Sequence, residues 1–518
     1  MPPFIPVLAP AEAADWDARA AARGIALATL MESAGRAVAA VLLRAFPLPA
    51  RQGVLIAVGT GHNGGDGWVL ARALARLGVP VSVTALPGPP AALTAAAAGQ
   101  ARADGVREVA PDGPWPAVGL VVDAILGTGA VGAPRAAAAA LLERIRELHL
   151  PMLAVDGPSG VDLGTGVVHG AARSDLSVTF GGFRRGHLLA RDEVGEVVVV
   201  DIGHPAADAR WPRFVTDADA MAWLPPLRAG DHKGDRGRVT VVGGDTGMGG
   251  AARLAGRAAF AAGAGLVHLV APATTIDAVR AAEPDLQTLA HPLEGAVDGA
   301  LDELLARSDV VVLGPGLGRS AARAEFVLAI LARCRRAVLD ADGLTVLAGR
   351  LPALAGLARE RDLVVTPHPG EFRTLFAEQA SLRETDPWAA ASQASDAAAC
   401  TVLLKGVPTV VAAREARVLT VAAGNPGLAT GGSGDVLSGL LGAMLVRQPD
   451  VARATAVAAQ ALGRAADLAA RRVTARAMRP TDVLAALPDL WRDWSAVHRM
   501  GLPLEPPVLA RLPAPIAL

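Results

Sequence analysis

Short hydrophobic runs alternate with segments of helical periodicity along most of the chain. Such runs, each closed by a glycine or a polar residue, occupy 53–59, 79–86, 120–129, 151–160 and 174–182, and later 237–244, 265–272, 309–318, 337–343, 362–371 and 401–406. Amphipathic segments such as 31–46 and 67–78 lie between them. Strands that alternate with helices in this way predict parallel sheets joined by helical crossovers.

The alternation stops between residues 205 and 230, where prolines and charges follow no clean period. A chain of 518 residues is also too long for a single hydrophobic core. We therefore predict an α/β protein with an N-terminal domain over 1–218 and a C-terminal domain over 225–490, followed by a Pro-rich C-terminal extension over 491–518. In open α/β sheets, ligands bind where the loops at the carboxyl ends of the strands gather.

The composition argues against several classes of partner. The formal net charge is −1, so the chain lacks the basic excess that favours nucleic acid or an anionic membrane. Cys334 and Cys400 fit neither a metal-ligand spacing nor a disulfide framework, which favours the cytoplasm. The longest apolar stretch, 258–273, contains His268 and is too short for a membrane span. The N-terminus lacks the regions of a signal peptide.

Lysine, asparagine and tyrosine are almost missing from the chain. Lysine occurs only at Lys233 and Lys405, asparagine only at Asn63 and Asn425, and tyrosine nowhere. A GC-rich genome explains the general loss, because these residues share AT-rich codons. We expect the four survivors to lie where their own chemistry is needed, since arginine cannot replace a compact ammonium group without changing the geometry.

The first glycine-rich loop, 58–67, follows a predicted strand and contains the pattern G-x-G-x-x-G. A dinucleotide-binding fold would need an acidic residue about 20 positions further on to bind a ribose hydroxyl. The segment 81–88 contains no acid, and Asp66 would place a negative charge against the pyrophosphate. The loop therefore does not favour an ordinary dehydrogenase. Asn63 and Asp66 suit a hydrated ring or a monovalent cation better.

Two more acids end strands in this half of the chain, Asp123 and Asp156. For either one alone, a helix N-cap is the favoured explanation. Three polar loops at the same edge of one sheet favour a binding site.

These loops resemble the NAD(P)H-hydrate epimerase domain. The resemblance rests on LMESAG, GTGHNGGDGWVLARAL, DAILGTG, DGPSGVDLGTG and SDLSVTFGG, and it spans about residues 10 to 215. The chain departs from the family pattern at His62, which replaces an asparagine, and at Gly157, which stands between Asp156 and Pro158 where the family usually has isoleucine. Arg184 and Arg185 stand near the place of a frequent family lysine.

The resemblance implies a Rossmann-like three-layer sandwich whose site interconverts the R and S epimers of hydrated NADH or NADPH. It implies that Asp156 is catalytic and that Asn63, Asp123 and Ser159 bind potassium. The substrate-binding residues that it implies are His62, Asn63, Gly64, Gly65, Asp66, Gly127, Thr128, Gly129, Ala130, Val131, Gly132, Ala133 and Asp156.

The second glycine-rich loop lies in 424–445, where glycines precede an apolar helix that begins near Asp435. Backbone N–H groups at a helix N-terminus bind anions, and glycines let a phosphate approach closely. A Walker P-loop is excluded, because no Lys-Ser/Thr follows the glycines. Asp435 can take a proton from a hydroxyl that attacks a phosphoryl group. The simpler alternative is an N-cap aspartate after a flexible turn.

This loop resembles that of ribokinase-like kinases, and its neighbours resemble the ADP-dependent NAD(P)H-hydrate dehydratase domain. The neighbouring motifs are HKGDRGRVTVVGG, GMGGAARLAGRAAFAAGAGLV, GPGLG, LDADGL, TPHPGEF and LLKGVPTVV, over about residues 228 to 475. The resemblance implies a ribokinase-like α/β domain in which ADP phosphorylates the hydroxyl of the S epimer. Loss of phosphate then restores the dihydronicotinamide and leaves AMP.

The same resemblance implies the site residues of the C-terminal domain. Asp435 would be the base, and Gly432, Ser433 and Gly434 the anion site. ADP and AMP would bind to Lys405, Gly406, Val407, Pro408, Thr409, Gly432, Ser433 and Gly434, and the hydrate to Ala252, Gly316, His368 and Asp435. Magnesium is expected with the nucleotide, with Glu371 as the candidate ligand.

Two alternatives remain open. The C-terminal domain could be a small-molecule kinase that phosphorylates a vitamin alcohol, with the N-terminal domain binding a ligand. The N-terminal domain could instead be a non-enzymatic scaffold, since folds are reused without their chemistry. The partners that we expect are small molecules and further copies of this chain in a homo-oligomer, without nucleic acid or membrane.

Overall fold

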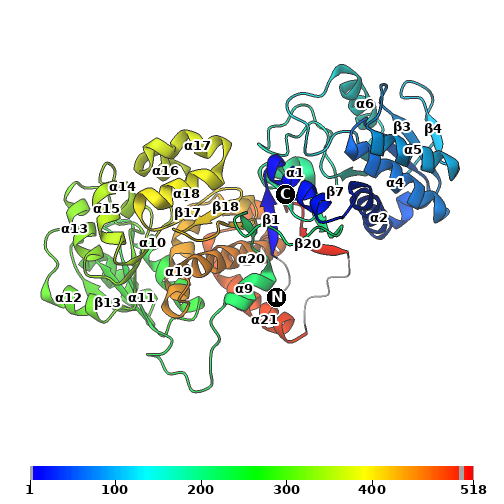
Figure 1. Ribbon diagram of the computed structural model, residues 1–518. Helices are drawn as coiled ribbons and strands as arrows, with labels where there is room; N and C mark the ends of the chain where they lie inside the picture. Colours follow the sequence, from blue (N-terminus) through cyan, green and yellow to red (C-terminus); the bar gives the residue numbers. More distant parts are fainter. Residues whose placement is uncertain (1–3, 501–506, 517–518) are drawn as a thin grey trace. The chain divides into compact units, whose positions relative to one another are not determined.

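In the computed structural model, which describes residues 4–500 and 507–516, the chain forms two compact units (Figure 1). The first comprises Met1–Phe214 with Pro503–Pro515, and the second comprises Val215–Leu502 with Ile516–Leu518. The chain thus passes from one unit to the next after Phe214.

The first unit is built on an eight-stranded sheet in the order β20-β9-β7-β6-β5-β2-β3-β4. In chain order, the strands are β2 (Val54–Val58), β3 (Val81–Ala85), β4 (Arg107–Val109), β5 (Leu120–Ala124), β6 (Met152–Val155), β7 (Leu176–Phe180), β9 (Glu196–Val200) and β20 (Val508–Leu512). Neighbours pair in parallel, except that β20 is antiparallel to β9. The strand order changes direction at β2, between β3 and β5, so the loops after β2 and β5 border a crevice where ligands bind in such sheets.

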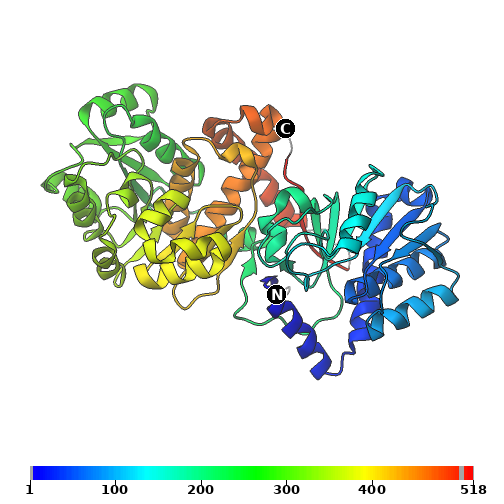
Figure 2. The ribbon, with the colours of Figure 1, turned by 90° about the horizontal axis from the view of Figure 1, so that it is seen from above.

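Helices cover both faces of this sheet (Figures 1 and 2). One face packs against α2 (Leu27–Ala45), α4 (His62–Arg76) and α5 (Ala92–Ala103), and the other packs against α6 (Ala136–Arg146). Alternate side chains of each strand point to opposite faces, so Ile56 and Val122 join the first core and Ala57 and Val121 the second. The result is the three-layer arrangement that the family resemblance implied, built on the parallel sheet that the alternating pattern predicted.

Smaller elements surround this sandwich. They are α1 (Pro10–Ala22), α3 (Pro47–Arg51), α7 (Arg185–Leu189), α8 (Arg191–Val194), β1 (Ile5–Leu8), β8 (Phe183–Arg184) and β10 (Arg213–Phe214). Strand β1 pairs in parallel with β8 and antiparallel with β10.

The second unit contains a sheet in the order β13-β12-β11-β14-β15-β16-β17-β18-β19. Its strands are β11 (Arg238–Val242), β12 (Leu266–Ala271), β13 (Gln287–Ala290), β14 (Val310–Leu313), β15 (Arg336–Leu339), β16 (Asp362–Val365), β17 (Thr401–Leu404), β18 (Thr409–Ala412) and β19 (Leu419–Val421). The strands from β13 to β17 pair in parallel, and β18 and β19 continue the sheet antiparallel.

The helices of the second unit lie on both faces of its sheet. They are α9 (Asp217–Trp223), α10 (Gly249–Ala261), α11 (Ala273–Ala282), α12 (Gly299–Ala306), α13 (Ala322–Leu331), α14 (Asp342–Thr345), α15 (Leu351–Ala358), α16 (Pro369–Leu375), α17 (Ala380–Thr385), α18 (Pro387–Ala398), α19 (Ser433–Arg447), α20 (Val451–Ala477) and α21 (Pro480–Met500), with 3-10 turns η1 (Ala377–Gln379) and η2 (Pro426–Leu428). The largest core, formed mainly of Ala, Val and Leu, joins the sheet to α10, α19, α20 and α21.

The C-terminal segment differs from the predicted extension over 491–518. Residues 491–500 belong to α21, and Val508–Leu512 add an edge strand to the sheet of the first unit. A Pro-rich composition argues against a strand in the middle of a sheet but is compatible with an edge strand. An edge strand forms backbone hydrogen bonds to only one neighbour, which here is β9.

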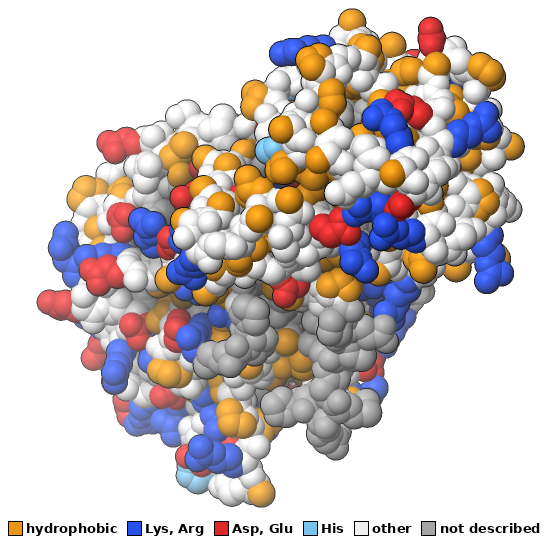
Figure 3. Space-filling model, turned by 45° about the vertical axis from the view of Figure 1, so that its right-hand side comes forward, with side chains coloured by type: hydrophobic (Ala, Val, Ile, Leu, Met, Phe, Trp, Pro, Cys, Tyr) orange, Lys and Arg blue, Asp and Glu red, His pale blue; other side chains and the backbone are white. Residues whose placement is uncertain are grey.

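The surface mixes charges of both signs. Figure 3 shows Lys or Arg side chains interspersed with Asp or Glu over the visible face, in agreement with a formal net charge of −1. Among the described residues, no single helix has the length and apolar character to cross a membrane, although α1 and α2, bent by 119°, pass that test as a pair.

Close packing of α19 on α10 requires a glycine at position 439. A Cβ at Gly439 would collide with the carbonyl of Ala255, which is backbone and cannot move aside. We predict that Gly439→Ala destabilises the second unit by more than about 3 kcal/mol, because overpacking forces the two helices apart. In the control Gly356→Ala, the new methyl group meets nothing within 4 Å in α15. This control should be neutral or stabilising by up to about 1 kcal/mol.

Thermal unfolding followed by circular dichroism compares the melting temperatures of the two variants. Equal melting temperatures would contradict the prediction.

Candidate active sites

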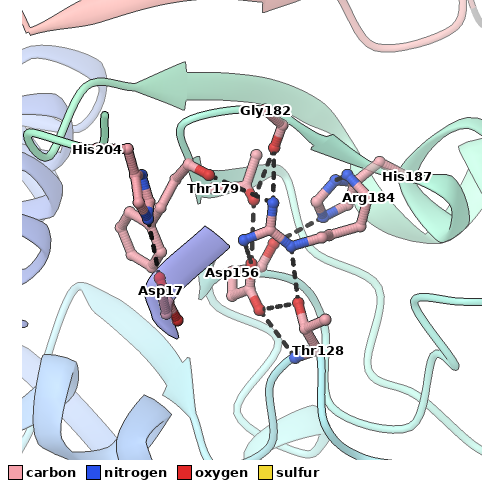
Figure 4. Close-up of polar contacts among 9 residues, drawn as sticks. Asp17, Thr128, Asp156, Thr179, Gly182, Arg184, His187 and His204 are labelled. Atoms are coloured by element: carbon pink, nitrogen blue, oxygen red, sulfur yellow. Dashed lines mark hydrogen bonds and ion pairs between the residues drawn. The ribbon is translucent and has the colours of Figure 1, made fainter. Parts of the chain in front are cut away.

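Asp156 lies at the end of β6 in a network of polar contacts (Figure 4). Its Oδ2 accepts hydrogen bonds from the backbone N–H of Thr128, at 2.8 Å, and from the Thr128 hydroxyl, while its Oδ1 accepts one from Thr179 at 3.0 Å. Its backbone has a φ of +64°, a left-handed conformation that costs free energy in a non-glycine residue. The surrounding contacts must therefore hold this residue in place.

Arg184 is the cationic partner of Asp156. Its guanidinium lies 3.6 Å from Asp156 Oδ1 and donates hydrogen bonds to the Thr128 hydroxyl at 2.9 Å and the Gly182 carbonyl at 3.0 Å. Burial by itself would raise the pKa of Asp156, but Arg184 and the hydrogen bonds from Thr128 outweigh burial and leave that pKa below its usual value. Asp156 is therefore held ionised.

His187 joins the backbones of these two residues. Its Nδ1 accepts a hydrogen bond from the Arg184 N–H at 3.0 Å, which leaves the ring proton on Nε2 to be donated to the Asp156 carbonyl at 2.7 Å. Burial lowers the pKa of His187 to about 4, so the ring is neutral near pH 7. Sequence reasoning missed His187 and Thr179. The basic pair after the Thr-Phe strand was the only signal for Arg184.

A second cluster surrounds the predicted potassium ligands. Ser159 donates to Asp123 from its backbone N–H and from its hydroxyl, each at 2.7 Å. Burial raises the pKa of Asp123, although these hydrogen bonds oppose the rise. Both polar atoms of the Asn63 side chain are buried without a hydrogen-bond partner, and this side chain packs beside Gly127 together with Asp156. A buried amide with no partner fits a site for an additional ligand.

A cavity of about 330 Å³ opens beside the Asp156 network. Its polar lining residues are Asp17, His62, Asp66, Arg184 and His204, and its apolar lining residues include Leu30, Met31 and Phe180. Burial raises the pKa of Asp66 well above its usual range, and the negative charges of Asp156 and Asp17 raise it further. Asp66 therefore favours its protonated form.

The other predicted epimerase residues differ in their surroundings. Gly64 and Gly65 are buried in the first turn of α4, and Thr128 contacts Asp156 directly. Within 127–133, Gly129, Val131 and Ala133 are exposed, and the cavity is not lined by any of these seven residues.

In the second unit, Asp435 lies in the first turn of α19, after Gly432 with a φ of +98°. Burial raises the pKa of Asp435 to about 7. The nearby negative charges of Asp340, Asp342 and Glu371 add to this rise, while Lys405 opposes it. A carboxyl group with a pKa near neutrality can accept a proton and release it again, as a general base must.

Asp340 is the residue that organises this site, and sequence reasoning assigned it no role. Its buried carboxylate accepts a hydrogen bond from Lys405 Nζ at 2.5 Å and another from the Ser438 hydroxyl at 2.5 Å. The ammonium group of Lys405 is thereby placed beside Gly434, at the N-terminus of α19. Asp340 is the first aspartate of the motif LDADGL, and this motif was the sequence signal for the contact.

The remaining predicted residues of the second unit surround the same edge of the sheet. Val407 is 70% exposed, whereas Ala252 is fully buried in α10. His368 is the N-cap of α16, and its backbone N–H donates to Glu371 Oε2 at 2.8 Å. Glu371 therefore already has a capping role. Among the described residues, no group of three His, Cys, Asp or Glu side chains is arranged to bind a metal ion.

The rare residues have different roles in the structure. Asn63 and Lys405 lie in the two clusters described above. Asn425 makes structural contacts instead, because its Oδ1 accepts from Gly427 N–H at 3.0 Å and its Nδ2 donates to Asp467 at 3.2 Å. Lys233 is exposed in the loop before β11.

Two family models match the chain, the YjeF-related protein N-terminus over residues 27–186 and the NAD(P)H-hydrate dehydratase over residues 239–489. The bifunctional NAD(P)H-hydrate repair enzyme Nnr of Escherichia coli (strain K12) is 36% identical over 475 residues, which cover 90% of this chain and 89% of the relative. Nnr of Pyrobaculum aerophilum is 37% identical over 496 residues, which cover 91% of this chain and 95% of the relative.

Among solved structures, the ADP/ATP-dependent NAD(P)H-hydrate dehydratase from Bacillus subtilis, co-crystallised with ATP and Mg²⁺, is 25% identical. It covers 55% of this chain and 98% of its own, with a TM-score of 0.47. The two curated relatives match across both units in the same order. From this match over about nine-tenths of its length, the chain belongs to the family of bifunctional NAD(P)H-hydrate repair enzymes.

Proposed function

We propose that the first unit interconverts the R and S epimers of hydrated NADH and NADPH, and that the second unit dehydrates the S epimer. The second reaction consumes ADP and releases AMP and phosphate. The observation that carries this proposal is that each unit has its own cluster of buried ionisable groups at the carboxyl edge of its sheet, around Asp156 in the first and Asp435 in the second. The vitamin-kinase alternative gives the Asp156 cluster no catalytic role.

Epimerisation requires one group that takes a proton and another that returns one. Asp156 and Asp66 are carboxyl groups whose pKa values shift in opposite directions, which separates an acceptor from a donor. Asp156, held ionised by Arg184, is the proposed acceptor, and Asp66, which lines the cavity, is the proposed donor. Arg184 also lines the cavity and links Asp156 to it.

Potassium would bind to Asn63, Asp123 and Ser159. These residues offer oxygen ligands that suit potassium, namely a carboxylate, a hydroxyl and an amide. The polar atoms of the amide, Asn63, are buried without a hydrogen-bond partner. The ion would supply a fixed positive charge beside the hydrate pocket. Ser159 holds the Asp123 carboxylate by two hydrogen bonds.

Dehydration would begin when Asp435 takes the proton of the substrate hydroxyl. The hydroxyl oxygen then attacks the β-phosphoryl group of ADP, and AMP leaves with the electron pair of the broken P–O bond. Backbone N–H groups of Gly432, Ser433 and Gly434 would bind the transferring phosphoryl group. Loss of phosphate and of a ring proton restores the dihydronicotinamide. Magnesium is proposed with the nucleotide, where it would neutralise phosphate charge.

The cellular setting remains a proposal. Both cysteines are free and buried, and free thiols without a disulfide suit the reducing cytoplasm. A homo-oligomer stays a prediction, which light scattering on the purified chain would test.

Asp435→Asn removes the proposed base of the dehydratase. We predict that ADP-dependent dehydration falls by roughly 10²–10⁴-fold, the usual contribution of a general base, while epimerisation is unchanged. In the unaltered enzyme the dehydration rate should fall as the pH drops below about 7, because protonated Asp435 cannot accept a proton. Absorbance of restored NADH measures both effects. A variant that keeps most of its dehydratase activity would show that the base lies elsewhere, since the N-cap of α19 is Gly432 and Asp435 is only an acidic residue of its first turn.

Lys405→Arg tests whether the ammonium group is a placed charge. Asp340 fixes Lys405 Nζ at 2.5 Å, and the larger, planar guanidinium cannot occupy the same position. We predict weaker ADP binding at a nearly unchanged melting temperature. Isothermal titration calorimetry and thermal unfolding are measured on the same samples. Unchanged ADP affinity would leave Lys405 with only a structural role, as the ion-pair partner of Asp340.

Asp156→Ala should slow R-to-S conversion severely without weakening potassium binding. With a mixture of both epimers, the variant should consume the S half quickly through its intact second unit. The R half should then lag at the rate of spontaneous epimerisation, whereas the unaltered enzyme should show no plateau. Progress curves of absorbance give this comparison, with the fast phase as the internal control for folding. A variant without a plateau would exclude Asp156 from the reaction.

A further inference from the structure

A third carboxylate, Asp17 of α1, lines the same cavity as Asp66 and Arg184. It lies close enough to Asp66 for its charge to raise the pKa of that group. The Asp17 side chain is 52% exposed, whereas that of Asp156 is 9% exposed. Asp17 therefore marks the solvent side of the cavity, and the Asp156 cluster its inner side.

His204 holds the Asp17 carboxylate in position (Figure 4). His204 Nε2 lies 2.8 Å from Asp17 Oδ1, and the imidazole is only 6% exposed. Its ring stacks on Trp16 with 4.4 Å between ring centroids, and Trp16 donates a hydrogen bond to the Pro205 carbonyl at 2.9 Å. The loop after β9 is thereby tied to α1.

Gly181 makes room for this stack. Its φ is +70°, and a Cβ there would lie 2.8 Å from both the His204 ring and the Trp16 ring. Because the His204 ring is packed in one position, it keeps the half-exposed Asp17 carboxylate in one orientation. A free aspartate on the surface has no such fixed orientation. This rigidity indicates a binding role, because an oriented acceptor costs less entropy when a ligand arrives.

On the basis of the proposed epimerase function, we propose that Asp17 accepts hydrogen bonds from the hydroxyls of the ribose attached to the nicotinamide ring, and that His204 is its positioning residue. The ribose connects the ring to the phosphates, which are charged and face water. When the ring lies beside Asp66 and Arg184, the ribose must pass the solvent side of the cavity, where Asp17 lies.

Asp17 would thus perform the task that an acid after the second strand performs in dinucleotide-binding sheets. Residues 81–88 contain no such acid, and the helix before the sheet supplies one instead. Both NADH hydrate and NADPH hydrate contain this ribose, since they differ only at the adenosine end. A contact at Asp17 must therefore contribute equally to the binding of both.

Epimerisation kinetics of Asp17→Asn in the full chain test the proposal. We expect KM for the R epimer to rise about tenfold, the effect of about 1.4 kcal/mol, with little change in kcat and the same factor for both hydrates. Asp15→Asn is the matched control, because Asp15 lies on the same helix, is 61% exposed and pairs with Arg19 outside the cavity. A fall in kcat at constant KM would overturn the ribose assignment.

Two further measurements separate positioning from folding. His204→Gln keeps a side-chain N–H donor for Asp17 and should retain most of the affinity, whereas His204→Leu should match Asp17→Asn. A substrate that lacks the 2′-hydroxyl of the nicotinamide ribose should lose affinity with the unaltered enzyme and lose no more with Asp17→Asn. Additive losses would refute the contact. If the unaltered enzyme itself failed to epimerise, the proposed function would be wrong. If instead Asp17→Asn epimerised as well as the unaltered enzyme, only the ribose assignment would be wrong.

Discussion

The buried ion pair between Asp156 and Arg184 is the interaction on which the N-terminal site depends. Two charges removed from water are costly unless their remaining hydrogen-bonding capacity is satisfied. Here Thr128, Thr179 and the Gly182 carbonyl satisfy it, and His187 ties the two backbones together. These contacts also hold Asp156 in a backbone conformation that a free aspartate rarely adopts. Charge, hydrogen bonding and backbone strain thus determine one another at the end of β6.

The second unit also contains a buried carboxylate with a cationic partner, but its other contacts differ from those of Asp156. Asp340 is the ionic partner of Lys405, directly after β17, and the hydrogen-bond acceptor for Ser438 on α19. One buried carboxylate therefore positions groups from two separate parts of the chain. Asp435 lies beside this pair, and its raised pKa results from burial together with the surplus of nearby acids. These acids raise the pKa of Asp435 only to about 7, because the positive charge of Lys405 opposes them. Substitution of any of these groups should change the titration of the others.

The two sites share a physical basis in the parallel sheet. The carboxyl ends of its strands bring loops from distant parts of the chain to one edge, and hydrophobic cores on both faces keep that edge rigid. A core formed mainly of Ala, Val and Leu allows close approach of helices, as at Gly439. Rigid backbone lets short polar side chains such as Thr128 and Ser159 hold carboxylates at fixed distances.

The sequence alone determined the fold class, the division into two α/β units and the loops of both candidate sites, because hydrophobic periodicity and glycine-rich turns are local properties. It also predicted functional roles for Asp66, Asp156, Lys405 and Asp435, which lie inside recognisable loops. It did not reveal Arg184, His187 and Asp340 as partners of these residues, nor the pairing of Asp17 with His204, 187 positions apart. The edge strand Val508–Leu512 was likewise hidden in a Pro-rich segment. Such partnerships depend on which strand ends become neighbours and on how deeply each charge is buried, and only the folded chain decides both.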